Sequence, residues 1–302
     1  MRLAEFKNVT LQHFKYLSNI LFMHLIVCSS KDVASMNIMN NLLTMLDFDR
    51  GKAGDYEFYH TDDIGIVKVD ERLIYADYLD ERLRKLGLKF EEILFASRHS
   101  SKDGRNILTV HVSGNVATAD YGGKPYSLAK PSPITMKNYT LALIKRLDEL
   151  PDFEFTLEAT HHGPSEIQTP SAFYEIGSTE DAWKNEKAGE IVAESMIEAL
   201  RDDRRDWIVA VGVGGTHYIP RQTEIMISTK FTFGHNFAKY TFPHLNEEIV
   251  EKAVKISDAK FIVIDEKSVT SNVKNLIKNV AEKLNIDVLK SKFVKREFKL
   301  EG

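Results

Sequence analysis

The amino-acid sequence predicts an α/β protein, in which strands and helices alternate around a largely parallel or mixed sheet. Short apolar runs of strand length recur along the chain, and each is followed by turn-forming residues. Between these runs, apolar residues repeat every three to four positions, as they do on the buried face of a helix. With 302 residues, 43% of them hydrophobic and 28% charged, the chain can bury a large core, as one α/β domain or two smaller ones.

The expected strands are short and rich in Val, Ile, Leu and Phe, and they cover residues 25–27, 64–69, 73–75, 93–97, 107–112, 153–157, 207–213 and 261–264. The expected helices cover residues 33–46, 80–86, 136–150, 191–200, 249–256 and 273–284. Capping residues precede two of them, with Asp32 before the helix at 33–46 and Asn246 before the helix at 249–256. Residues 121–133 are the least regular stretch and indicate a long surface loop or a hinge. Because the alternation resumes after this loop without a change in composition, we expect one continuous sheet.

The first 22 residues stand apart, because the core pattern begins only near His24. The apolar run at 20–27 resembles the hydrophobic core of a signal peptide. However, Asn19 and His24 interrupt the apolar stretch, no small-residue cleavage site follows, and the run is too short to cross a bilayer. We therefore expect residues 1–22 to be an appended extension, with Met23 as a candidate start, and residues 23–302 to form a single α/β domain.

The charge balance excludes a polycation, since 40 basic residues face 44 acidic ones and the net charge is −4. Any contact with nucleic acid must therefore use a local basic patch. One candidate patch lies at the C-terminus and consists of Lys290, Lys292, Lys295, Arg296 and Lys299. The same residues are also typical of a solvated edge strand that lysines protect from pairing.

Cys28 is the only cysteine, so the chain forms no intrachain disulfide and suits a reducing, cytosolic compartment. A cysteine-based metal site is excluded for the same reason. A metal ion would have to be held by His, Asp or Glu, whose nitrogen and oxygen atoms suit zinc, manganese or iron.

Histidines follow three of the expected strands. His161 and His162 come after the strand at 153–157, and the turn at Gly163 directs both rings toward one place. His99 follows the strand at 93–97, and His217 follows the strand at 207–213. Ligands gather at the carboxyl ends of strands in open α/β sheets, so these histidines indicate a metal or catalytic site. The alternative is structural, with one ring packed inside and its nitrogens satisfied by backbone groups.

The glycine-rich segment 212–217 also suggests a phosphate-binding loop, because glycines let backbone amides approach a phosphate closely. The spacing matches neither a P-loop nor the dinucleotide-binding fingerprint. A tight turn that projects His217 into a cleft explains the same residues. His235 and His244 lie in expected loops, where a single histidine more often faces solvent.

Several segments taken together resemble the archaeal and plant type of D-aminoacyl-tRNA deacylase. The resemblance starts at about Met23 and runs to the C-terminus, and its segments are Cys28-Ser29 to Ala34-Ser35, Ser97-Arg98-His99, His111-Val112-Ser113-Gly114-Asn115, Glu158-Ala159-Thr160-His161-His162-Gly163-Pro164 and Gly214-Gly215-Thr216-His217-Tyr218 with Pro220-Arg221. It implies a zinc-dependent cytosolic esterase with a three-layer α/β/α fold of the phosphorylase/hydrolase kind. It also implies that tRNA carrying a D-amino acid is the substrate, with no membrane or DNA partner. Residues 1–22 have no counterpart in this family.

The residues and the resemblance together predict roles at the site. We expect one or two zinc ions held by histidines, namely His161, His162 and His217, with His99 and His235 as further candidates. The expected catalytic residues are Glu158, as general base, extra ligand or outer-shell partner, with His162 and Arg98. The residues expected to bind substrate or tRNA phosphates are Lys124, Arg221, Gly214 and Gly215.

The expected reaction is hydrolysis of the ester that joins a D-amino acid to tRNA, by water that zinc activates, in a protein that works as a monomer. One alternative is a metal-dependent hydrolase of the same fold that acts on peptides or small esters and amides. Another is a non-catalytic RNA-binding module in which the histidines are structural.

Overall fold

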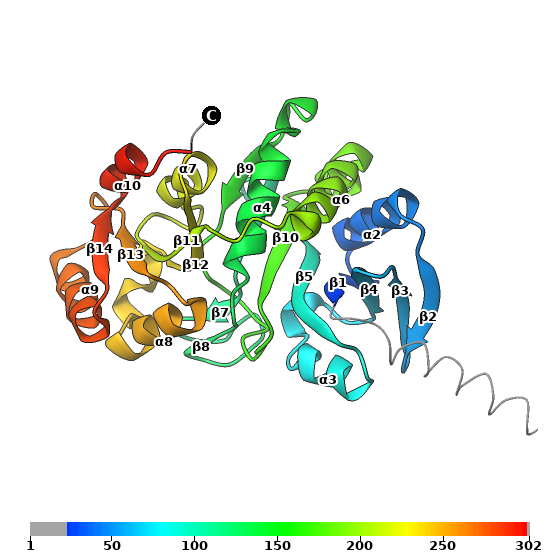
Figure 1. Ribbon diagram of the computed structural model, residues 1–302, viewed down its shortest axis with the longest axis horizontal. Helices are drawn as coiled ribbons and strands as arrows, with labels where there is room; N and C mark the ends of the chain where they lie inside the picture. The colour runs from blue at the N-terminus through cyan, green and yellow to red at the C-terminus, as the bar shows by residue number, and fades with distance from the viewer. Residues whose placement is uncertain (1–22, 301–302) are drawn as a thin grey trace, which may run out of the picture.

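The computed structural model describes residues 23–300, so the expected N-terminal extension at 1–22 lies outside the described residues. The chain forms a mixed sheet of eight strands in the order β2-β3-β4-β1-β5-β10-β6-β9, and a separate sheet of four parallel strands in the order β12-β11-β13-β14 (Figure 1). A two-stranded ribbon, β7-β8, lies near their junction. The α/β class is as predicted, but the expectation of one continuous sheet is wrong.

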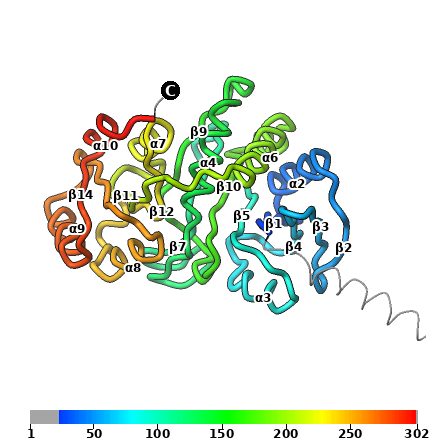
Figure 2. The backbone as a smooth tube through the Cα atoms, in the orientation of Figure 1, coloured from blue at the N-terminus to red at the C-terminus, as the bar shows by residue number. Residues whose placement is uncertain are grey.

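The strands of the large sheet are β1 (Met23–Ser29), β2 (Asp49–Ala53), β3 (Tyr56–His60), β4 (Ile64–Val69), β5 (Phe90–Arg98), β6 (Ile107–His111), β9 (Glu154–Leu157) and β10 (Ser171–Gly177). Those of the small sheet are β11 (Ile208–Val213), β12 (Phe231–Phe237), β13 (Phe261–Ile264) and β14 (Asp287–Lys290), and the ribbon is β7 (Gly114–Asn115) and β8 (Ser127–Leu128). The chain runs broadly from one end of the molecule to the other, from the β1–β4 region (blue) to the α9–α10 region (red) (Figure 2).

The α-helices are α2 (Val33–Met45), α3 (Leu79–Lys85), α4 (Pro133–Ile144), α5 (Glu180–Lys184), α6 (Glu186–Arg201), α7 (Pro220–Ser228), α8 (Glu247–Ser257), α9 (Ser271–Leu284) and α10 (Ser291–Glu297). Within residues 23–300, three short 3-10 helices occur, namely η1 (Leu73–Tyr75), η2 (Leu147–Glu149) and η3 (Lys239–His244). Two capping predictions are confirmed, because the side chains of Asp32 and Asn246 accept hydrogen bonds from the first turns of α2 and α8. No helix within residues 23–300 is both long and apolar enough to cross a membrane.

The main errors of prediction concern short or polar elements. Residues 73–75 form η1 and not a strand, and α10 follows the helix expected to be the last. The expected helix 136–150 begins earlier, at Pro133, and ends at Ile144. Strands β2, β3, β10 and β12 were not predicted, and the last two carry polar residues inside fully buried segments.

The two faces of the large sheet differ in a way that places the site. On one face, Leu94, Leu108 and Tyr174 pack beneath α2, α4 and α6 (Figure 1). The other face is apolar under α3, where Phe95 and Phe173 stack with ring centres 4.7 Å apart. Further along β10, the face that carries Phe173 becomes polar.

The polar part of this face follows from the period of two along each strand. Glu175 of β10 lies opposite Ser97 of β5 and Thr109 of β6, and His111 lies opposite Phe173. All four polar side chains are buried. A buried polar patch on a sheet requires partners, and here the large sheet and the segments beside it supply them: Thr109 Oγ1 donates to Glu175, Glu175 lies near His99 and His111, and Ser97 Oγ donates to Asp32.

The small sheet has helices on both faces, with α8 and α9 on one and α7 and α10 on the other. Strand β14 is its edge and ends at Lys290, but Lys292, Lys295 and Arg296 lie in α10, so the edge-strand interpretation of the C-terminal basic residues is right for Lys290 alone. In Figure 1, helix α10 lies at the upper left and the β7-β8 ribbon at the lower centre.

A buried lysine joins the two halves of the molecule. Lys137 of α4 is fully buried, and its ammonium group donates hydrogen bonds to the carbonyl oxygens of Met226 and Thr229 at the end of α7. The last carbonyl groups of a helix have no partners within the helix and carry partial negative charge. Lys137 thus closes the C-terminal end of α7 and fastens it to the helix layer of the large sheet.

Replacing Lys137 with Met keeps the length of the side chain and removes the donor. We expect K137M to lower the free energy of unfolding by about 1–3 kcal/mol, because buried carbonyl groups lose their partner. Lys145 at the end of the same helix is exposed and pairs with Glu198, so K145M should change stability by less than about 0.5 kcal/mol. Denaturant unfolding measures both, and equal losses would contradict the capping role.

Candidate active site

The segment that follows β9 connects the two sheets. The backbone N–H of Ala159 donates to the carbonyl of His217, and the N–H of Thr160 donates to the carbonyl of Asn236, each at 2.9 Å. Glu158 forms an isolated bridge with Tyr218. Because of these bonds, the histidines after β9 and the histidine after β11 meet at one place, as the pattern of strand ends predicts.

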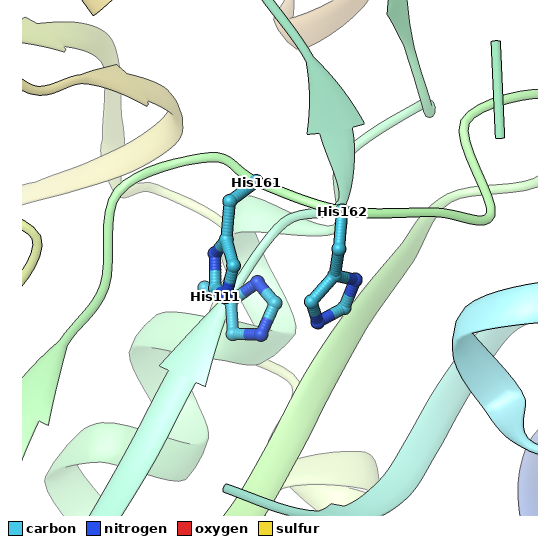
Figure 3. Close-up of side chains that lie close together, drawn as sticks. All are labelled: His111, His161 and His162. Carbon is cyan, nitrogen blue, oxygen red and sulfur yellow. The ribbon is translucent and has the colours of Figure 1, made fainter. Parts of the chain in front are cut away.

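Three histidines face one another at the end of β6. His161 and His162 project from one loop toward His111, the last residue of β6 (Figure 3). The ring centre of His111 lies 4.3 Å from that of His161 and 4.8 Å from that of His162. One ring nitrogen from each of the three lies within 4.8 Å of the others, so the set has the donors for a metal ion.

Backbone carbonyl groups hold two of these rings. The Nδ1 atom of His161 lies 2.8 Å from the carbonyl oxygen of Ala159, and that of His162 lies 2.6 Å from the carbonyl oxygen of Gly163. In neutral histidines, a proton on Nδ1 makes these hydrogen bonds and leaves Nε2 with its lone pair free. Metal-ligating histidines in proteins commonly have this arrangement.

Glu158 lies beneath the histidines and is only 1% exposed. Its carboxylate oxygens lie 2.7 Å from His217 Nε2, 3.1 Å from His99 Nδ1 and 3.6 Å from His161 Nε2. Burial alone would raise the pKa of Glu158, but His217 and His99 outweigh it and hold the pKa well below its usual range. The carboxylate is therefore ionised, and it forms a second donor set with His161 and His217.

Glu175 of β10 is a second buried carboxylate behind the first. Its Oε2 atom lies 3.6 Å from His99 Nδ1 and 3.7 Å from His111 Nε2. Burial opposes ionisation, but His111 and His99 lower the pKa of Glu175 to about 2. In return, although burial opposes it, Glu158 and Glu175 raise the pKa of His99 to about 11, and Glu175 raises that of His111. Protons on His99 and His111 thus balance the two carboxylates.

The outer histidines have the opposite tendency. Burial and the neighbouring His111 lower the pKa of His161 well below its usual range and that of His162 to about 4. Both rings are neutral near pH 7, the form in which imidazole binds metal ions.

These groups open into a pocket of about 410 Å³ between the two sheets. His161, His162 and His217 line it, together with Tyr121 from the loop after β7 and Tyr240 from η3. A groove of about 650 Å³ along α2 is larger but contains no histidine, so volume alone does not mark the site.

Comparisons of the sequence with known proteins point to one family. A family model described as D-aminoacyl-tRNA deacylase matches residues 86–289. A relative from Archaeoglobus fulgidus, named D-aminoacyl-tRNA deacylase, is 64% identical over 278 residues, which is 92% of this chain and 100% of the relative. A relative of the same name from Methanosarcina mazei is 38% identical and covers 91% of this chain and 95% of its own length. The chain belongs to the D-aminoacyl-tRNA deacylase family.

The fold of this family member also matches a solved structure. A crystal structure of a conserved protein of unknown function is 64% identical, with a TM-score of 0.91, and covers 93% of this chain and 99% of its own. Futalosine hydrolase of Helicobacter pylori is similar over 60% of this chain, with 14% identity and a TM-score of 0.40, which is too low to bear on the assignment.

The structure brings together His161, His162, His217, His99 and Glu158 of the predicted set, but not Arg98. The Arg98 guanidinium lies over the Trp183 ring, 4.9 Å from its centre, and the Arg98 N–H donates to Asp32. Arg98 alternates with Ser97 and His99 along the chain, so its side chain points away from the pocket.

The predicted substrate-binding residues are also dispersed. Arg221 at the start of α7 pairs with Glu224 and does not line the pocket. The N–H of Gly214 donates to the carbonyl of Phe237, and that of Gly215 donates to Ser268 Oγ. Both amides are occupied, which favours the tight turn over the phosphate cradle. Lys124 is exposed in the loop after β7 and contacts Tyr78.

His235 requires a correction, because it lies in strand β12 and not in a loop. It is fully buried, its Nδ1 contacts Thr160 Oγ1 at 3.1 Å, and its Nε2 contacts the carbonyl oxygen of Ala129 at 3.0 Å. With both nitrogens engaged, it does not join the histidine cluster. Its role is to fasten the small sheet to the segment that carries His161.

Two residues of the cluster, His111 and Glu175, were absent from the predicted set. His111 lies one residue before the end of the strand expected at 107–112, so the same position near a strand end could have indicated it. Glu175 gave no such signal, because it interrupts the apolar pattern of a strand that was itself not predicted.

The burial of His235 predicts a pH dependence of stability. Burial lowers the pKa of His235 to about 3, so the folded protein keeps it neutral while the unfolded chain binds a proton below pH 6.5. Above pH 6.5 His235 is neutral in both states and does not affect the pH dependence. As the pH falls from 6.5 toward 3, proton binding stabilises the unfolded chain and lowers the free energy of unfolding by up to about 1.4 kcal/mol per pH unit. H235Q should therefore show a shallower decline in unfolding free energy between pH 6 and 4.

The control is H244Q, which replaces an exposed histidine and should keep the wild-type decline. Denaturant unfolding at several pH values measures all three proteins. Parallel curves for the wild type and H235Q would show that His235 does not stay neutral.

Proposed function

We propose that this chain hydrolyses the ester bond of D-aminoacyl-tRNA and releases the free D-amino acid and tRNA. Family membership supports the activity, since the relatives carry that name. The observation that supports a hydrolytic site is the convergence of five histidines and two buried carboxylates beside one pocket. A cytoplasmic, monomeric enzyme remains our expectation.

We further propose zinc as the cofactor, and the residues fit a divalent cation. Within the described residues, both ring nitrogens of His111 and both carboxylate oxygens of Glu158 are buried without a hydrogen-bond partner. Although Glu158 and His217 are close, the two groups are not aligned as a hydrogen bond. Unsatisfied buried donors and acceptors are costly, and a cation among them would satisfy several at once.

The charge of the cluster supports the same proposal. Two ionised carboxylates lie among histidines of which His161 and His162 favour the neutral form. A divalent cation would replace the proton on His111 as a balancing charge, while His99 would keep its own. His111, His161 and His162 would form one donor set, and Glu158 with His161 and His217 a second, so the residues suit one ion or two.

Bound zinc would lower the pKa of a water molecule from about 16 toward 7 and polarise the ester carbonyl. The chain's own groups would direct this chemistry. Glu158 would hold the ion and carry the negative charge nearest to it, while Glu175 would fix the orientation of His99 and His111. His99, held between Glu158 and the Tyr218 hydroxyl at 2.8 Å from its Nε2, would keep a proton inside the site.

Removal of one shared ligand tests the proposal. We expect H161A to lose most of its zinc and at least about 100-fold of its rate on D-tyrosyl-tRNA, because His161 belongs to both donor sets. H60A, on strand β3 outside the pocket, should keep both. Elemental analysis and deacylation of D- and L-tyrosyl-tRNA provide the measurements.

Each outcome separates the proposal from its alternatives. Equal rates on the two enantiomers would favour a general metallohydrolase over chiral proofreading. A zinc-free preparation with full activity would contradict the metal, and a protein that binds tRNA but hydrolyses neither ester would favour a binding module.

Glu175 gives a finer prediction, because it contacts histidines and does not line the pocket. E175Q should weaken zinc binding by about 10- to 100-fold through loss of the partner that orients His111. The matched control is E92Q, which removes another buried carboxylate paired with a histidine, His24, at 2.8 Å. E92Q should lower stability and leave zinc affinity unchanged, whereas equal effects on affinity would rule out a specific role for Glu175.

A further inference from the structure

The exposed aromatic residues of this protein are concentrated near the pocket. Among the described residues, seven large hydrophobic side chains are exposed, and five of them are tyrosines that we call the tyrosine rim: Tyr75, Tyr78, Tyr121, Tyr126 and Tyr240, between 37% and 66% exposed. Scattered single exposures need no explanation, but Tyr121 and Tyr240 line the histidine pocket itself, and contacts of the loop after β7 connect the other three tyrosines to it.

Contacts within the loop after β7 connect the rim to the pocket. Asn115 lines the pocket, and its side-chain amide donates to the carbonyl oxygens of Gly122 and Lys124 at 2.8 and 3.2 Å. These bonds hold the loop that carries Tyr121 and Tyr126 against the opening. The N–H of Tyr126 donates to Ala117, which also lines the pocket.

The same loop lies against η1 and the start of α3, where Tyr75 and Tyr78 are. Gly122 has a φ of +81°, and a Cβ atom there would collide with the carbonyl oxygen of Ile74 and lie 3.0 Å from the Tyr75 ring. Lys124 donates to the Tyr78 hydroxyl, with its ammonium 5.0 Å from the ring centre. On the opposite side of the opening, Tyr240 of η3 lies near His217, with ring centres 6.2 Å apart.

Cations accompany these rings. The Arg72 guanidinium lies 5.6 Å from the centre of the Tyr75 ring, Lys124 pairs with Tyr78, and exposed Lys239 precedes Tyr240. Of the described residues that line the pocket, Asp120 is the one that is acidic. Aromatic faces with interleaved cations are the features by which proteins bind single-stranded nucleic acid, because bases stack on the rings and phosphates contact the cations.

Backbone strain marks the same region. Five described residues other than glycine have positive φ angles: Tyr78, Tyr126, His162, Asp258 and Asn285. Asp258 and Asn285 are helix C-caps, where this conformation is common. Tyr78, Tyr126 and His162 are bulky residues for which this conformation is strained, and all three are at the rim or in the pocket.

We infer that the tyrosine rim binds the unpaired nucleotides at the 3′ end of RNA and guides the terminal residue into the histidine pocket. This inference rests on the proposed function and specifies its substrate contact. The bases of the single strand stack on the tyrosines, while Arg72, Lys124 and Lys239 contact its phosphates. The rim therefore recognises an unpaired 3′ end and not a duplex.

The test measures the binding of uncharged RNA and so does not depend on hydrolysis. The probe is a fluorescent stem-loop with an unpaired ACCA 3′ segment, compared with the same stem ending blunt. We expect Y121A and Y75A each to weaken binding of the ACCA probe by about 5- to 100-fold and to leave the blunt probe unchanged. Y121F keeps a stacking ring and should retain most of the affinity, and F293A, an exposed aromatic on α10, should retain all of it.

A second variant separates function from folding. Y126G removes a ring from a position with a φ of +51°, where glycine is the less strained residue. We expect its thermal midpoint to equal or exceed that of the wild type while its affinity for the ACCA probe falls.

Equal losses for the blunt and ACCA probes, or unchanged affinity in both Y121A and Y75A, would overturn the inference. A wild-type protein that deacylates D-tyrosyl-tRNA but does not distinguish the two probes would do the same and leave the proposed function intact. Conversely, tyrosine-dependent binding of the ACCA probe by a protein without hydrolytic activity would support the rim and contradict the proposed function.

Discussion

The arrangement of the site depends on the burial of one ionised carboxylate. Glu158 lies at the junction of the two sheets with almost no exposure, and an isolated charge in such a place is strongly destabilising. Its cost is offset only by the histidines that surround it, and these come from three separate parts of the chain, after β5, β9 and β11. Electrostatics therefore requires the two sheets to meet at this point, and hydrophobic packing elsewhere makes the meeting possible.

Glu175 extends the same constraint into the large sheet. An apolar residue in the middle of β10 would pack against Phe173 and Thr109 without any need for charge compensation, and buried ion pairs are seldom the more stable choice. The chain nevertheless places a second carboxylate there and balances it with His99 and His111. A network that costs stability and lies behind a pocket is most simply explained by function.

Much of the architecture follows from local pattern, because apolar runs and capping residues act over short distances. The strands that carry His99, His161 and His217 could be predicted for this reason, as could the caps at Asp32 and Asn246. The separation into two sheets could not, because register and pairing depend on contacts between residues far apart in sequence. Strand β12 was missed since Gly234, His235 and Asn236 have the composition of a loop, and only their burial against the segment at 159–160 makes them a strand.

The site was predicted in part for the same physical reason. A histidine that follows an apolar strand can be recognised from the sequence alone. The contacts of Arg98 and His235, in contrast, depend on which face of its strand each side chain occupies. Those faces become known only when the neighbouring strand is placed. Three residues depart from the usual preferences of their residue types. Glu175 places a charge inside β10, Tyr78 has a left-handed backbone, and Tyr121 exposes its ring. In natural sequences, local propensity, hydrophobic pattern and packing usually favour the same structure, and exceptions tend to occur at functional sites. Three such exceptions near one pocket therefore indicate that the pocket is the functional site.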